Sequence, residues 1–196
     1  MKHTLGENFH AVSFYEDQES LCSTVVEFIS EGIEAGQPAL VIARPPHRAE
    51  IVEALRARGI DVNRLQAAGD LVVLDARDTL ATFFANGQLN TAVFHEQAAQ
   101  LLERVCTGRT DCTIWAYGEM VDLLWEADQP LAAILLEMLW NKLAATWKLC
   151  ILCGYSTRNP YRDDDITDVC GQHTHVFGAD AVWKPSAGIT GDHPGG

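Results

Sequence analysis

The first candidate site for chemistry in this 196-residue chain is the segment after its first apolar run, Tyr15-Glu16-Asp17-Gln18-Glu19. A phosphate-binding loop needs glycines, so that backbone N–H groups can approach the phosphate, and a lysine to neutralise it. This segment has neither, and its three carboxylates would repel phosphate. We therefore expect no nucleotide cofactor. We expect Asp17 to cap a helix and Tyr15 to contribute to the wall of a pocket for a neutral ligand.

A basic group, Arg44, His47 and Arg48, stands at the start of a helix that Pro45 and Pro46 open. A helix N-terminus favours anions through its free N–H groups and its dipole. The group is thus a candidate ligand-binding site for an acidic molecule. The alternative is a solvated helix face balanced by nearby acidic residues.

Two sets of cysteine and histidine residues have the chemistry of metal or redox sites. Cys170, His173 and His175 could coordinate zinc, although no fourth ligand is evident, and ordinary packing or a pH-responsive imidazole are the alternatives. Cys150 and Cys153 lie within an apolar strand, where residues i and i+3 point to opposite faces about 10 Å apart. We expect them to pack in the core and to form no disulfide.

The elements that position these residues alternate between strand and helix. Apolar runs predict strands at residues 10–15, 38–43, 70–76, 113–117 and 148–155 and a last short strand at residues 175–177. Stretches with helical spacing separate them, among them a short helix over residues 79–85. This order predicts an α/β fold, a mostly parallel sheet with helices on both faces. We expect one domain over residues 1–183 and a disordered tail rich in proline and glycine over residues 184–196.

Ligands of such sheets bind where strands end and helices begin. The fourth strand ends at Tyr117 and Glu119, and the long helix that follows carries Trp140 and Asn141. If that helix returns over the sheet, these four residues line one pocket. Asn141 also forms an i,i+4 polar stripe with Glu137, and a solvent-facing stripe is the alternative.

The composition excludes several classes of partner. Lys plus Arg number 14 and Asp plus Glu 27, a net charge of −13 that opposes binding to nucleic acid or to an anionic membrane. No apolar segment suits a signal peptide or a membrane span, so we expect a cytoplasmic protein whose six cysteines are reduced thiols.

Four stretches of the chain carry a family resemblance: HAVSFYEDQESLCSTVVEFISEGIEAGQPALVIARPPHRAEI, GDLVVLDARDTLATFFANGQ, AYGEMVDLLWEADQPLAAILLEMLWNKLA and CGQHTHVF. They resemble the MEDS domain (methanogen/methylotroph, DcmR sensory domain) over about residues 9–178. The resemblance implies a core like that of the RecA and KaiC ATPases without the phosphate-loop and magnesium motifs. It also implies a sensor of small molecules, with hydrocarbon derivatives as proposed ligands, and no catalytic residues to carry over.

These observations lead to one hypothesis and two alternatives. The first is a non-enzymatic sensor that binds a small molecule, such as a hydrocarbon or one-carbon derivative, and regulates a separate signalling or transcription partner. The second is a metal- or redox-responsive regulator that uses Cys170, His173 and His175. The third is a degenerate ATPase-like scaffold without ligand, which assembles with itself or with a partner.

Overall fold

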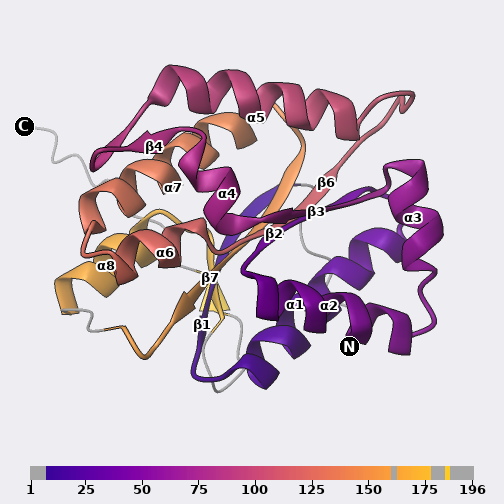
Figure 1. The fold of residues 1–196 in the computed structure, drawn as a ribbon, viewed down its shortest axis with the longest axis horizontal. Helices are drawn as coiled ribbons and strands as arrows, with labels where there is room; N and C mark the ends of the chain where they lie inside the picture. Colours follow the sequence, from indigo (N-terminus) through magenta and orange to yellow (C-terminus); the bar gives the residue numbers. More distant parts are fainter. Residues whose placement is uncertain (1–7, 160–162, 178–183, 186–196) are drawn as a thin grey trace, which may run out of the picture.

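The computed structural model describes residues 8–159, 163–177 and 184–185, and places one seven-stranded sheet between two layers of helices (Figure 1). Every neighbouring pair of strands in this sheet is parallel except β8 with β9. This architecture confirms the predicted three-layer, mostly parallel α/β fold. The strand order is β3 (Leu71–Asp75), β2 (Ala39–Ala43), β6 (Ile114–Gly118), β7 (Leu149–Ser156), β1 (Phe9–Tyr15), β8 (His175–Phe177) and β9 (Lys184–Pro185).

The helices divide between the two faces of the sheet (Figure 1). None of those in the described part of the chain is long and apolar enough to cross a membrane. One face carries α1 (Gln18–Glu34), α2 (Pro45–Ala57) and α3 (Val62–Ala68), and the other carries α4 (Ala76–Ala81), α5 (Thr91–Val105), α6 (Met120–Glu126), α7 (Pro130–Ala144) and α8 (Asp163–Gly171).

Local structure between β3 and α5 differs from the predicted helix over residues 79–85. Asp75 caps α4 by accepting hydrogen bonds from the N–H groups of Arg77 and Asp78, so the helix begins earlier and ends at Ala81. A two-stranded hairpin follows, β4 (Phe84–Ala85) and β5 (Gln88–Leu89). Its turn residues, Asn86 and Gly87, both have positive φ, as a two-residue hairpin turn requires.

Successive side chains of β7 point to opposite faces of the sheet and pack in two separate cores. Cys150 belongs to the core on the face of α1 and α2, whereas Cys153 belongs to the core on the face of α6 and α7. Both cysteines are buried and neither is part of a disulfide, which confirms that they are not linked to each other. The thiol of Cys153 does not pack only against apolar groups, however, because it contacts polar side chains described below.

The expectation that all six cysteines are reduced is wrong for one pair. Cys106, at the end of α5, and Cys112, in the connection to β6, form a disulfide. The turn between them brings their Cα atoms to 5.7 Å, within the range that a disulfide spans. The sequence alone does not reveal this approach, because it depends on how the chain turns after α5.

The C-terminal segment is described only in part. Lys184 and Pro185, which the sequence assigns to the start of a disordered tail, form β9 and pair antiparallel with β8. Residues 186–196 of that predicted tail, and residues 178–183 before it, lie outside the described residues.

Packing of α1 on the sheet depends on Gly32, and this generates a stability prediction. A Cβ atom at Gly32 would lie 2.3 Å from Cγ of Trp115 on β6, too close for α1 and the Trp115 side chain both to remain in place. We expect Gly32→Ala to lower the free energy of unfolding by about 1–3 kcal/mol through overpacking, despite the better helix propensity of alanine. Urea denaturation measures the change. Gly171→Ala is the matched control, because a Cβ there meets nothing within 4 Å. Equal stability of the two variants would contradict this packing.

Candidate functional site

The parallel strands end at one edge of the sheet, where a buried polar network surrounds Glu119. The Glu119 side chain is completely buried between β6 and α6. Its carboxylate accepts a hydrogen bond from the backbone N–H of Arg44 at 2.6 Å and contacts Nδ1 of His47 at 2.7 Å. The turn after β2 and the turn after β6 are thereby joined.

Asp122, in the first turn of α6, holds the other half of this network. Its Oδ1 accepts hydrogen bonds from the N–H of Ser156 and the amide of Asn159, and its Oδ2 from Tyr15 and the Arg44 guanidinium. Burial raises the pKa of Asp122, although the Ser156 N–H and Arg44 oppose this. Burial, followed by the charges of Asp122 and Glu119, raises the pKa of Tyr15.

The predicted basic group therefore meets acidic groups of the chain itself. Arg44 pairs with Asp122 and also with the half-exposed Glu126, at 2.8 Å. Arg48 lies 3.7 Å from Asp75 at the end of β3. Tyr117 lies deeper, with its phenol buried beside Gly154, where an added Cβ would come within 2.7 Å of the phenol oxygen.

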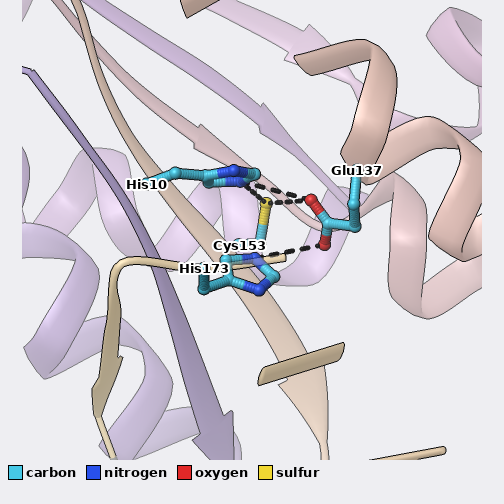
Figure 2. A group of neighbouring side chains, drawn as sticks. All are labelled: His10, Glu137, Cys153 and His173. Atoms are coloured by element: carbon cyan, nitrogen blue, oxygen red, sulfur yellow. Dashed lines mark hydrogen bonds and ion pairs between the residues drawn. The ribbon is translucent and has the colours of Figure 1, made fainter. Parts of the chain in front are cut away.

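A second polar group lies inside the molecule, between the sheet and α7. His10 on β1, Glu137 on α7, Cys153 on β7 and His173 after α8 converge on one point (Figure 2). Their exposed fractions are 2%, 0%, 3% and 4%. The ligand atoms that they offer all lie within 4.8 Å of one another. We call these four residues the His–Glu–Cys cluster.

Contacts within the His–Glu–Cys cluster are close. Nε2 of His10 lies 3.2 Å from Sγ of Cys153 and 3.2 Å from Oε2 of Glu137. Sγ of Cys153 lies 3.4 Å from the same carboxylate oxygen. Nε2 of His173 lies 3.4 Å from Oε1 of Glu137. Four segments far apart in sequence thus meet at the two oxygens of one carboxylate (Figure 2).

An outer set of hydrogen bonds fixes the orientation of these side chains. Nδ1 of His10 meets the amide oxygen of Asn141 at 2.9 Å, and that amide donates to the Gln172 carbonyl at 2.8 Å. Nδ1 of His173 meets the carbonyl of Val169 at 2.7 Å. Tyr155 donates its hydroxyl hydrogen to Glu137 at 2.7 Å.

The charges of the cluster influence one another. Burial alone would raise the pKa of Glu137, but His173 and His10 outweigh burial and hold the pKa well below its ordinary value. Burial, and then Glu137, raise the pKa of the Cys153 thiol well above its ordinary value. The two imidazoles therefore stabilise the Glu137 carboxylate, and Glu137 in turn raises the pKa of His173 against the effect of burial.

The structure distributes the predicted metal ligands and pocket residues differently from the sequence interpretation. His173 joins the cluster, whereas His175 packs its ring on Phe9, a core residue on the α1 side of the sheet. Cys170 is a half-buried free thiol and is not a member of the four-residue group. Asn141 lies beside His10 and not beside Glu119.

Trp140 lines an apolar cavity of about 200 Å³ between the sheet and α4, α5, α6 and α7. Its ring packs edge-on against Phe94, which packs in turn against Phe83. Exposed residues on α5 form part of the lining, so the cavity reaches the surface there. The lining residues are Ile42, Leu74, Thr79, Thr82, Phe83, Phe94, Gln97, Ala98, Leu101, Arg104, Met120 and Trp140.

Comparison with known families identifies the family of the chain. Residues 9–174 match the model of the MEDS family, whose description is MEthanogen/methylotroph, DcmR Sensory domain. The chain belongs to the MEDS family. No curated protein matches it. The polar network, the His–Glu–Cys cluster and the lining of the cavity all lie within the matched residues of this MEDS domain.

The site predicted from the sequence of this MEDS domain lacks His10 and Cys153, and it includes Glu137 only as part of a polar stripe. His10 and Glu137 each carry a detectable signal. His10 begins an apolar strand, and Glu137 interrupts a helix that is apolar on almost every side. A polar side chain inside an apolar element is buried only at a cost unless it is paired, so the two signals together point to a shared internal site.

The buried position of Glu119 in the MEDS domain generates the second prediction. The two oxygens of the Glu119 carboxylate meet the Arg44 N–H and Nδ1 of His47. Glutamine would replace one of these oxygens with an NH2 group, which donates a hydrogen bond and cannot accept one. We expect Glu119→Gln to lower the free energy of unfolding by about 1–3 kcal/mol. The matched control is Glu126→Gln, which removes a half-exposed partner of Arg44 and is expected to change stability by less than about 0.5 kcal/mol. Urea denaturation of both variants gives the comparison, and similar losses in both would contradict the assignment of Glu119 as a buried anchor.

Proposed function

We propose that this MEDS domain is a non-enzymatic sensor that binds a small, neutral, largely apolar molecule and passes the signal to a separate protein. The observation that carries this proposal is the apolar cavity beside Trp140. Membership of a sensory-domain family supports the sensor role. Trp140 is the predicted pocket residue that lines this cavity.

The size and lining of the cavity support a ligand of hydrocarbon type. An apolar cavity of roughly 150 Å³ accommodates benzene, so about 200 Å³ suits a molecule of that size or slightly larger. The aromatic rings of Phe83, Phe94 and Trp140 supply apolar contact area. Thr82 and Gln97, which hydrogen-bond to each other, supply polar atoms that could orient a functional group.

The proposed output runs through α7. Trp140 on this helix lines the cavity, and Leu131, Leu135 and Met138 on the same helix are exposed large apolar side chains. Exposed apolar surface of this kind serves protein–protein contacts. A ligand that shifts Trp140 would shift the helix carrying that surface, which is how we propose the signal reaches a protein partner.

The absence of catalysis belongs to the same proposal and gives the third prediction. Asp17 accepts a hydrogen bond from the N–H of Ser20 and caps α1 at the position where a phosphate loop would lie. We expect phosphate release from Mg-ATP by the purified protein to equal that of buffer alone. Turnover above buffer that a Glu16→Ala substitution removes would contradict this expectation.

The fourth prediction tests the cavity with a substitution that fills it. Ala98 lines the cavity from α5, and Ala98→Leu adds three carbon atoms there. Binding to the native state stabilises it by RT ln(1 + [L]/Kd), about 2.7 kcal/mol at a hundredfold excess over Kd. We expect benzene, toluene or dichloromethane to raise the melting temperature of the wild type, and Ala98→Leu to lose at least half of that increase.

Gln100→Leu is the matched control, because it places the same side chain on the same helix at an exposed position. It should keep the full ligand-induced shift. Circular dichroism of both variants without ligand shows that each is folded. An unchanged shift in Ala98→Leu, or no shift with any of the three probes in the wild type, would contradict the proposed ligand site.

A further inference from the structure

The His–Glu–Cys cluster has the composition of a metal site rather than of a packed core. Two imidazoles, a thiol and a carboxylate are buried together, and they come from β1, α7, β7 and the segment after α8. Burying such groups is costly unless each finds a partner. Among the residues that the structure describes, these four are the histidine, cysteine and acidic side chains whose ligand atoms lie close enough together to share one ion.

The outer hydrogen bonds determine which atoms face the centre. Nδ1 of His173 faces the Val169 carbonyl, which can only accept, so Nδ1 carries hydrogen. The Asn141 amide donates to the Gln172 carbonyl and therefore presents its oxygen to Nδ1 of His10. In each neutral imidazole the lone pair is then on Nε2, the nitrogen that faces Glu137. Lone pairs and a carboxylate thus converge, and a cation between them would satisfy them together.

The distances agree with a tetrahedral ion. Zinc bonds of about 2.0–2.1 Å to nitrogen, 2.0–2.2 Å to oxygen and 2.3 Å to sulfur place neighbouring ligand atoms about 3.3–3.6 Å apart. The three atoms from His10, Glu137 and Cys153 form a triangle with sides of 3.2, 3.2 and 3.4 Å. Nε2 of His173 lies 3.4 Å from the same carboxylate and within 4.8 Å of the other ligand atoms (Figure 2). Small side-chain movements would complete the tetrahedron.

We propose that His10, Glu137, Cys153 and His173 bind one zinc ion. Thiolate and imidazole ligands suit zinc, whereas magnesium and calcium prefer sites made of oxygen atoms. Four buried protein ligands leave no open coordination position, so the ion would be structural or regulatory and not catalytic. On binding, the Cys153 thiol loses its proton to solvent, and the thiolate and the Glu137 carboxylate balance the two charges of the ion.

The outer contacts have the form that zinc sites use. A zinc-bound histidine commonly donates its second ring N–H to a carbonyl or carboxylate, which fixes the ring. Val169 and Asn141 fulfil this role for His173 and His10. Asn141 is thus a positioning residue. The argument for zinc does not rest on the cavity ligand, because the lining of the cavity and the four zinc ligands share no residue.

The test is zinc binding by the untagged full chain, stripped with a chelator and kept under a reductant. Titration with zinc against a chromophoric competitor, with elemental analysis after desalting, should give one ion per chain. Cobalt in place of zinc should give tetrahedral visible bands and a near-ultraviolet thiolate-to-cobalt band. Cys153→Ser should abolish the thiolate band and weaken zinc binding by more than about 100-fold, since even an outer partner commonly contributes 10–100-fold.

Cys150→Ser is the matched control: the same substitution, three residues away on the same buried strand and on its other face. It should keep one ion and the thiolate band. His173→Gln, outside the central strands, is a second ligand variant in case Cys153→Ser does not fold, and it should also lose the ion. No binding by folded wild type, no thiolate band with cobalt, or equal binding by Cys153→Ser and Cys150→Ser would each overturn the proposal.

Discussion

The structure depends on how it compensates three completely buried carboxylates, Glu119, Asp122 and Glu137. A buried ionised carboxylate is costly unless hydrogen bonds and opposite charge replace its water. Glu119 and Asp122 obtain both from the chain, through backbone N–H groups and the Arg44 guanidinium. That compensation joins the turns after β2 and β6 to the end of β7, and so fixes the edge of the sheet.

Glu137 has no arginine or lysine partner among the contacts described for it, and only imidazoles, a thiol and a phenol surround it. This difference distinguishes a self-contained network from a site that a cation would complete.

Sequence patterns predict much of this fold because the fold follows local rules. Apolar runs separated by capped helices define the strands of a parallel sheet, and alternation on β7 places Cys150 and Cys153 on opposite faces. The hairpin at Asn86-Gly87 replaces part of a predicted helix, because the cap at Asp75 starts that helix earlier. The Cys106–Cys112 disulfide depends on the path of one turn, which no periodicity describes.

The His–Glu–Cys cluster lies beyond such rules because strand order creates it. β1 is the first strand of the chain, yet it lies between β7 and β8. Only this order brings His10 next to Cys153 and lets the segment after α8 run beside β1, where Thr174 donates its N–H to the His10 carbonyl. Sequence spacing favoured Cys170, His173 and His175 as one group, since they are close in the chain. His173 and His175 in fact face different surroundings, the α7 side and the Phe9 side of the sheet.

One helix relates the proposed zinc site to the proposed ligand cavity. Glu137, a member of the His–Glu–Cys cluster, and Trp140, which lines the cavity, are three residues apart on α7. Interfaces between packed elements respond to a ligand by shifting as units, since close-packed side chains leave little room for continuous deformation. An ion that ties Glu137 to β1 and β7 would hold α7 against the sheet and limit how far Trp140 can move. Occupation of the cluster would then set how strongly a molecule in the cavity can displace α7. Because coupling between two sites is reciprocal, a cavity ligand that moved α7 would change the affinity of the cluster for its ion by the same factor.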